Sequence, residues 1–214
     1  MKNVYRKLSV AIISVLMLVS VCYGQACAIT NATGLLKIST ASTLEEGELV
    51  SSYNHFNGRS YASLGLGVLH GVEVTITSRV FSKSPDLIGN LKVLLLDEDR
   101  WPAVAVGLTA SNNNANYYIV GSRQIGLPGL RGHFGLGTGR YSKGFAGISS
   151  VLNPVTVSSR AKGYALPLTT AVLEYDGRGL NTGVIMRFRP DLEGKLYVSD
   201  LQYFGLALRY TTFF

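Results

Sequence analysis

Apolar and polar residues alternate along most of this sequence at every second position, which is the period of a β-strand with two different faces. In residues 72–79, which read VEVTITSR, two valines and an isoleucine alternate with a glutamate, two threonines and an arginine. The same alternation recurs in residues 90–95, 103–109, 130–137 and 180–189. Beyond residue 28, no stretch has a sustained apolar period of 3.6 residues, so the pattern predicts an all-β fold.

About twelve such segments follow one another, each close to the 9–11 residues that cross a bilayer as a tilted strand. Turn-forming sequences such as HFNGRS, SNNNAN and YDGRG separate them. The predicted strands start near residues 47, 59, 71, 88, 102, 115, 127, 144, 164, 179, 192 and 201. Residues 29–48 are rich in threonine and serine, and they need not form part of the sheet.

Alternation alone does not separate a soluble sandwich from a membrane barrel, because the apolar face is buried in the first and faces lipid in the second. The 24 glycines favour the barrel, since many lie on the polar face, where small residues suit a curved inner wall. Tyrosine and phenylalanine also cluster near predicted strand ends, as in interfacial girdles. Unpaired backbone groups are costly in lipid, so a spanning sheet must close. We therefore predict a single closed antiparallel transmembrane β-barrel of about 12 strands with periplasmic termini, and keep a soluble secreted sandwich as the alternative.

The first 28 residues have the layout of a secretory signal peptide. Three basic residues precede an apolar stretch over residues 8–21, and alanines at 26 and 28 form a small-x-small cleavage site. We expect residues 1–28 to be this signal peptide and residues 29–214 to form an outer-membrane β-barrel domain, exported to the Gram-negative outer membrane. An N-terminal anchor helix and a lipid-anchored cysteine are weaker alternatives, since the apolar stretch is short for a span and neither cysteine has a good lipidation context.

Charge and cysteine content exclude several classes of partner. The whole chain has 20 basic and 13 acidic residues, but three basic residues leave with the predicted leader, so 17 stand against 13. This mild excess gives little support to a nucleic-acid partner, and we predict none. Both cysteines lie in the leader, so the mature chain would have no disulfide and no thiolate metal ligand. The acidic residues 97–99 lack calcium-loop spacing and are predicted to form a solvated turn, so we predict no cofactor and no metal.

The polar faces of the predicted strands carry charged residues that would face the lumen. One hypothesis is a positive conduit or binding surface for an anionic polysaccharide, because arginine pairs well with carboxylates. The other is a packed lumen in which Glu73 and Glu174 pair with arginines and fill the space. The candidate lumen residues are Arg123, Arg131, His133, Glu174, Arg187, Arg189 and Arg209.

An enzymatic function has less support in the sequence. His55, His133 and Asp176, together with many serines, supply the residue types of acyl transfer, as in an outer-membrane lipid-modifying enzyme. However, no nucleophile motif such as G-x-S-x-G is present. We predict no enzymatic activity, and keep the lipid-modifying enzyme and a generic small porin-like channel as alternatives.

The alternation continues to the last residue of the sequence, LALRYTTFF. Leu206, Leu208, Tyr210 and Phe214 fall on one face, with Thr212 the weakest member of the series. This ending resembles the last strand by which outer-membrane barrels are recognised, with alternating apolar residues and a terminal aromatic. We predict that these four residues form an assembly signal, so the barrel-assembly machinery and outer-membrane lipid are expected partners.

A series of segments, in order, resembles the YjbH-like outer-membrane proteins over roughly Gly34 to Gly183. The segments are GLLKISTASTLEEGEL, GVEVTITSR, LKVLLLDEDRWPAVAVGLTA, NYYIVGSRQIG, GHFGLGTGR, FAGI and LEYDGRGLNTGV, of which PAVAVGL and LEYDG are the more specific. That family is associated with exopolysaccharide production and export in Gram-negative bacteria. The resemblance implies a non-enzymatic role in exopolysaccharide biosynthesis or export, as a conduit, scaffold or accessory, with export proteins as partners.

Overall fold

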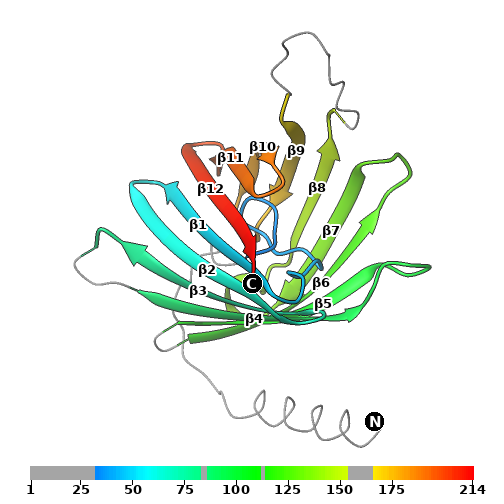
Figure 1. The fold of residues 1–214 in the computed structure, drawn as a ribbon, viewed down its shortest axis with the longest axis horizontal. Helices are drawn as coiled ribbons and strands as arrows, with labels where there is room; N and C mark the ends of the chain where they lie inside the picture. The colour runs from blue at the N-terminus through cyan, green and yellow to red at the C-terminus, as the bar shows by residue number, and fades with distance from the viewer. Residues whose placement is uncertain (1–31, 83–85, 112–113, 154–165) are drawn as a thin grey trace, which may run out of the picture.

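Twelve strands form one closed antiparallel barrel in the computed structural model, which describes residues 32–82, 86–111, 114–153 and 166–214 (Figure 1). The strands are β1 (Glu48–Phe56), β2 (Arg59–Leu69), β3 (Val72–Val80), β4 (Leu87–Leu96), β5 (Ala103–Ser111), β6 (Asn114–Gln124), β7 (Leu130–Gly137), β8 (Phe145–Val151), β9 (Leu168–Tyr175), β10 (Leu180–Arg189), β11 (Leu192–Ser199) and β12 (Tyr203–Phe213). The predicted fold and strand number are confirmed. The predicted signal peptide lies outside the described residues.

Each strand pairs with its neighbours in sequence, and the seam between the first and last strands closes the sheet. At this seam, Glu48 lies opposite Phe213 and Phe56 lies opposite Gly205. We call the end of the barrel where β1 starts and β12 finishes the termini end, and the opposite end the far end. No helix among the described residues is long and apolar enough to cross a membrane.

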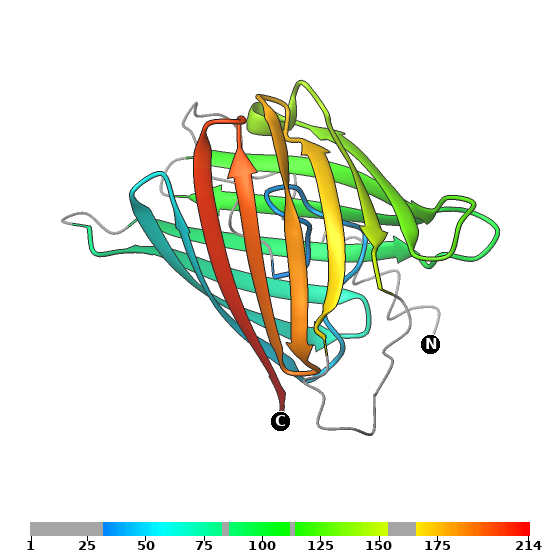
Figure 2. The same cartoon turned by 90° about the horizontal axis from the view of Figure 1, so that it is seen from above.

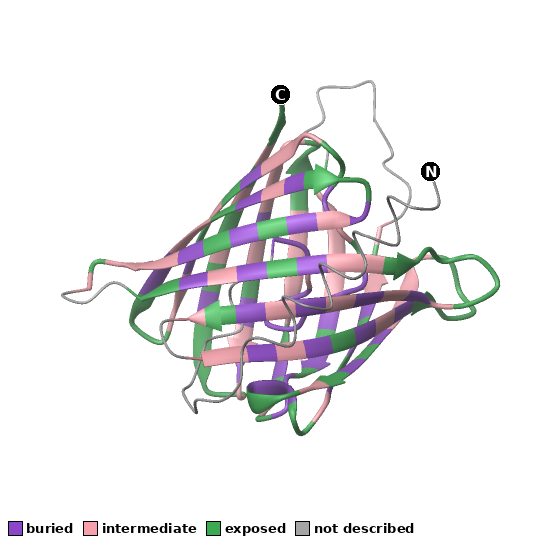
Figure 3. Cartoon of the chain, turned by 90° about the horizontal axis from the view of Figure 1, so that it is seen from below, coloured by how far each residue is buried: buried purple, intermediate pink, exposed green. Residues whose placement is uncertain are grey.

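The two faces of the strands have the division that the alternation predicts. On β3, Glu73, Thr75 and Thr77 are buried inside the barrel, whereas Val74 and Ile76 are exposed on its outer surface. Figure 3 shows the same alternation of buried and exposed residues along neighbouring strands. An exposed apolar surface of this extent suits lipid rather than water. Exposed apolar residues of the outer wall also include Leu64, Phe134, Ile148, Leu173 and Phe204.

Glycines on the inner wall make room for aromatic rings. A Cβ atom on Gly107 would lie 2.2 Å from the ring of Tyr118, and one on Gly205 would lie 2.3 Å from the ring of Tyr197. These distances are shorter than any van der Waals contact, so the rings can lie this close to the wall only beside glycine. The predicted placement of glycine on the inner wall is thereby explained by packing.

The N-terminal part of the described chain lies inside the barrel rather than in the sheet. Figure 2 shows this segment, drawn in blue, enclosed by the strands. We call residues 32–46 the lumen segment. At the far end, a short 3₁₀ helix, η1 (Gly139–Tyr141), brings Tyr141 into the interior between β7 and β8. The lumen is therefore filled by a piece of backbone as well as by side chains of the wall.

Candidate functional site

The lumen segment folds back on itself in a tight turn. Gly34 and Ser39 form a β-bridge, and the N–H of Leu35 donates to the carbonyl of Ile38 at 3.1 Å. One arm therefore leads to a tip near residues 35–38, and the other arm returns toward β1. Because the segment belongs to no strand ladder, its remaining backbone groups must find partners on the barrel wall.

Near the termini end, a buried ion pair on the wall holds both arms of the segment. Lys92 Nζ lies 3.2 Å from Glu73 Oε1, and these side chains are 0% and 1% exposed. Glu73 Oε2 accepts the Thr33 hydroxyl at 2.6 Å and the N–H of Leu44 at 3.1 Å. Lys92 also donates to the carbonyl of Thr33 at 3.0 Å and to its hydroxyl. The two charges thus neutralise each other while they satisfy the segment.

A second buried carboxylate, Glu174, holds the tip. It accepts the N–H of Leu36 at 3.0 Å and the N–H of Lys37 at 2.8 Å, and the side-chain amide of Asn181 donates to it at 3.1 Å. Two successive N–H groups directed at one carboxylate fix the orientation of the tip, since a charged acceptor forms the stronger kind of hydrogen bond.

The side chain of Lys37 reaches the far end from the tip. Its ammonium lies 2.7 Å from Asp176, donates to Ser199 Oγ at 2.9 Å and lies 5.2 Å from the centre of the Phe56 ring. Burial acts to raise the pKa of Asp176, but the hydrogen bond and charge of Lys37 outweigh it, so that this pKa lies below its ordinary value. Asp176 is therefore ionised at neutral pH and secures the tip.

The wall also binds the segment through Lys195 and Tyr118. The Lys195 ammonium donates to the carbonyls of Gly34 at 3.2 Å and Leu35 at 2.6 Å. On the returning arm, the Ser39 hydroxyl donates to the Tyr118 hydroxyl at 3.1 Å. Lys195, on β11, and Tyr118, on β6, thus bind different arms of the segment.

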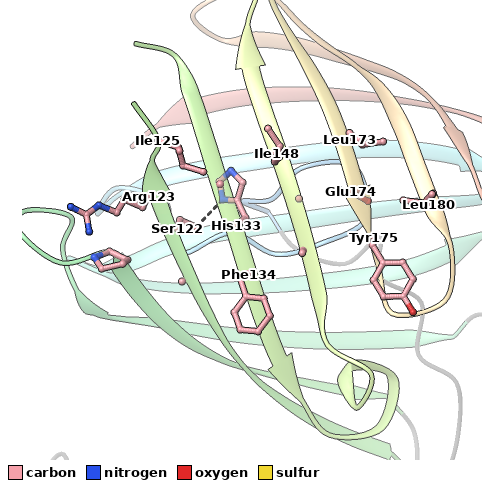
Figure 4. Close-up of a pocket in the computed structure, with 15 residues that line it drawn as sticks. Ser122, Arg123, Ile125, His133, Phe134, Ile148, Leu173, Glu174, Tyr175 and Leu180 are labelled. Carbon is pink, nitrogen blue, oxygen red and sulfur yellow. Dashed lines mark hydrogen bonds between the residues drawn. The ribbon is translucent and has the colours of Figure 1, made fainter. Parts of the chain in front are cut away.

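The predicted lumen residue His133 lies inside the barrel and is linked to the lumen segment through Ser122. The N–H of Ala41 donates to Ser122 Oγ at 2.9 Å, and Ser122 Oγ lies 2.8 Å from His133 Nδ1 (Figure 4). The other ring nitrogen of His133 lies 3.3 Å from Ser149 Oγ. Because both nitrogens face hydroxyl groups and Asp176 binds Lys37, the structure does not assemble these residues as an acyl-transfer triad.

Apolar residues of the tip pack against a cluster of aromatic rings in the far half of the lumen. Ring centres lie 4.9 Å apart for Tyr118 and Tyr141, and 5.4 Å apart for Tyr141 and Phe145. This buried cluster, which we call the aromatic cup, consists of Tyr118, Tyr141, Phe145 and Tyr197, and it packs with Leu35, Leu36 and Ile38 of the tip.

Of the predicted lumen arginines, Arg209 faces the interior beside the lumen segment, and the others do not line the middle of the barrel. Four lie toward the termini end and pair with acids, as Arg131 with Glu98, Arg187 with Glu193 at 3.7 Å, Arg189 with Asp191 at 3.0 Å and Arg209 with Glu48 at 3.4 Å. The side chains of Arg187 and Arg189 are more than half exposed. The prediction that Arg123 faces the lumen is wrong, because it follows the inward-facing Ser122 on β6 and points away from the interior (Figure 4).

The packed lumen is present, but the predicted partners of its two carboxylates are wrong. Glu73 pairs with Lys92, and Glu174 binds backbone N–H groups of the lumen segment, so neither pairs with an arginine of the described ranges. The prediction considered only strand side chains as filling. The threonine- and serine-rich composition of residues 29–48 was the available signal that a non-strand segment could bind inside a polar lumen.

Of the acidic residues 97–99, Glu98 binds the barrel rim. Glu98 accepts the N–H of Gln124 at 2.7 Å and binds Arg131. The hydrogen bond from Gln124, followed by that from Arg131, holds the pKa of Glu98 below its ordinary value. Within the described ranges, no group of three histidine, cysteine or acidic residues is placed to hold a metal ion.

The residues of the predicted assembly signal lie on the outer surface at the seam. Leu206, Leu208 and Tyr210 are exposed on β12, and Phe214 follows the strand with its N–H donating to the carbonyl of Gly47 at 3.3 Å. This placement leaves the side chains accessible from outside the barrel. Their role in assembly stays a prediction.

Comparison with known proteins places this geometry among porin-like barrels. Residues 30–165 match the YjbH family, described as "Exopolysaccharide biosynthesis protein YbjH". No curated protein matches the sequence. The KdgM porin is similar in structure, with a TM-score of 0.50 and 10% identity over 78% of this chain and 99% of that one. The NanC porin, in a rhombohedral crystal form, has a TM-score of 0.45 and 12% identity over the same shares. The likeness to the KdgM porin supports the fold.

Proposed function

We propose, on the premise that this chain belongs to the YjbH family of exopolysaccharide biosynthesis proteins, that it is an outer-membrane barrel with a non-enzymatic role in exopolysaccharide export. In this proposal the barrel is a conduit that the lumen segment keeps closed at rest. The observation that carries it is the presence of residues 32–46 inside the lumen, held by side chains of the wall.

The location in the outer membrane is supported by the wall itself. Its outer face is apolar, its sheet is closed, and its last strand ends in the predicted assembly signal. Insertion into lipid would cover the exposed apolar residues, and closure leaves no unpaired strand edge in the bilayer. Export by the N-terminal signal peptide is part of the same proposal.

A closed conduit agrees better with the interior than a solid scaffold does. Barrels of about 8 strands are filled by their own side chains, and those of 16–18 strands leave an aqueous channel. With 12 strands, this wall encloses the two arms of the lumen segment. Their removal would leave a passage through the barrel, and the ladder of the wall would not need to open.

The proposal is tested by removing the lumen segment. The variant lacks residues 32–43 and keeps Leu44 and the turn into β1. After purification and refolding, conductance in planar bilayers is compared with that of the full chain, and slower migration on heating in gel electrophoresis verifies the barrel. We expect the full chain to be closed and the shortened chain to conduct steadily.

The outcomes separate a conduit from a scaffold. A shortened chain that folds but does not conduct would exclude a conduit and leave a scaffold. In cells, secreted exopolysaccharide is measured in a strain without the gene and in that strain complemented with the full chain. Equal secretion in both strains would contradict a role in export.

A further inference from the structure

We infer that the surface beneath the lumen segment is a binding site for an uncharged glycan chain, and that the tip and the glycan compete for it. The inference rests on the proposed function and adds the class of substrate. It follows from three properties of the far half of the lumen, namely its aromatic rings, its neutral polar groups and the position of its carboxylates.

The aromatic cup offers ring faces to whatever occupies the lumen. In the closed barrel, the apolar side chains of Leu35, Leu36 and Ile38 cover it. Without the tip, the rings would line a water-filled passage. A sugar ring presents a face of C–H groups that packs on an aromatic face in the same way as these aliphatic side chains, and its edges stay free to form hydrogen bonds.

Neutral hydrogen-bonding groups adjoin these rings. Asn54 accepts the hydroxyl of Tyr197 at 2.9 Å, and Asn181 accepts the hydroxyl of Ser199 at 2.7 Å. A carboxamide both donates and accepts, which suits the paired hydroxyl groups of a sugar. Further buried neutral polar residues of the inner wall are Asn90, Asn116, Thr75, Thr77, Thr109, Ser122 and Ser149.

The carboxylates make an anionic chain a poor occupant. Departure of the tip would remove the Lys37 ammonium from Asp176 and two N–H groups from Glu174. Glu174 and Asp176, close together on β9 and its following turn, would then lack these donors, and the nearby cations are Lys195, which binds the segment backbone, and Arg140, which lies over the Tyr141 ring of the cup. By contrast, Glu73 would keep its partner Lys92. An anionic chain would bring further negative charge beside these two carboxylates, whereas an uncharged glycan would replace the hydrogen bonds of the tip without doing so.

The site is tested with two oligosaccharides of matched length in the variant lacking residues 32–43. Maltohexaose is the uncharged probe and hexagalacturonate is the anionic probe. We expect maltohexaose to interrupt the single-channel current at lower concentrations than hexagalacturonate. Hexagalacturonate blocking as well as maltohexaose, or no block by maltohexaose, would overturn the inference.

A substitution pair locates the site within the barrel. Tyr118→Leu in the shortened chain removes a ring of the aromatic cup, and we expect maltohexaose binding to weaken by about threefold to tenfold. Tyr175→Leu, on the exposed face of β9, is the matched control and should leave binding unchanged. Equal effects of the two substitutions would contradict a site at the cup.

A measurement on the full chain covers the case in which the shortened chain does not refold. Maltohexaose at high concentration should speed hydrogen exchange at the N–H groups of Leu36 and Lys37, because it competes with the tip, and hexagalacturonate should not. Unchanged exchange would contradict competition. A strain without the gene that secretes normal exopolysaccharide would instead contradict the export role, and would leave the binding result as it stands.

Discussion

The wall of the barrel and the lumen segment are held by different kinds of contact. In the wall, backbone N–H and carbonyl groups pair with each other along twelve strands, and the seam between β1 and β12 completes the ladder. In the lumen segment, many backbone groups pair with side chains of the wall, such as Glu73, Glu174 and Lys195. Substitution of one such side chain leaves the backbone ladder of the wall intact, but it removes several of the contacts that hold the lumen segment.

This difference teaches where the protein can change state without unfolding. A backbone ladder is lost cooperatively, because neighbouring hydrogen bonds support one another, whereas individual side-chain anchors can be released in turn. The segment can therefore leave the lumen while the wall stays closed. The predictions below perturb first the wall and then the segment.

The largest effect is expected when the seam is shortened. Deletion of Phe213 and Phe214 removes the pairing of Phe213 with Glu48 and the terminal aromatic of the predicted signal. We expect most of the assembled barrel to be lost, measured as the heat-modifiable form in outer-membrane fractions, with export unaffected. Phe81→Ala, which changes an exposed aromatic in a turn, is the control. Normal assembly of the deletion variant would contradict the signal.

Removal of the buried carboxylate at the termini end should release both arms of the lumen segment. Glu73→Ala leaves the Lys92 charge buried without its partner, which costs about 3–5 kcal/mol of unfolding free energy. Denaturant unfolding in detergent measures this loss, and hydrogen exchange at Leu44 reports the release. Asp191→Ala breaks the more exposed pair with Arg189 and should cost less than about 1 kcal/mol. Similar losses in the two variants would contradict the central role of the buried pair.

Loss of Lys37 should release the tip alone. Lys37→Met removes the contacts with Asp176 and Ser199, at a cost of about 1.5–3 kcal/mol for charged hydrogen bonds. We expect faster hydrogen exchange at Leu36 without a change at Leu44. If both sites exchange faster to the same degree, the two ends of the segment are not independent.

The same contact predicts a dependence on pH. Because the pKa of Asp176 is lowered in the folded state, its contribution is complete above the unfolded value of about 3.9 and is lost as pH falls through the folded value. Exchange at the tip, corrected for its intrinsic pH dependence, should rise as the pH falls below about 4. Lys37→Met should flatten this profile, and an unchanged profile would exclude the Asp176 contact as its cause.

The smallest effect is expected from crowding one ring against the wall. Gly205→Ala places a methyl group against the ring of Tyr197, at a cost of about 1–3 kcal/mol. Gly89→Ala, on β4, is the matched control, because a Cβ atom there meets nothing within 4 Å. Denaturant midpoints measured in detergent compare the two. Equal midpoints would show that the ring of Tyr197 moves aside without cost.

The wall could be predicted from the sequence because each strand repeats one local rule. Alternation in residues 72–79 assigned both faces of β3 correctly, and the same rule found the strand number. The rule assigns a residue to the wrong face where few residues of a strand distinguish its inner face from its outer face. Because Arg123 is charged, the sequence predicts that it faces the lumen. The hydrogen bond between Ser122 and His133 shows that Ser122 faces inward, so the next residue on the strand, Arg123, faces outward.

The site was less predictable, because its contacts join residues far apart in the sequence. Glu174 was recognised as a lumen residue, yet its partners are N–H groups of Leu36 and Lys37, which carry no side-chain signature. The sequence does not single out Lys195, because its partners are the backbone carbonyls of Gly34 and Leu35, which carry no side-chain signature. No periodicity marks residues 32–46, since they belong to neither helix nor sheet.

Gly47 joins the lumen segment to both ends of the wall, which has a consequence for the order of folding. Its N–H donates to the carbonyl of Gly67 on β2 at 2.9 Å, and its carbonyl accepts the N–H of Phe214. The first contact closes the β1–β2 hairpin and can form early, whereas the second needs β12 to reach β1. The base of the segment is therefore fixed beside the first hairpin before the seam closes, and we expect the segment to be enclosed as the barrel assembles.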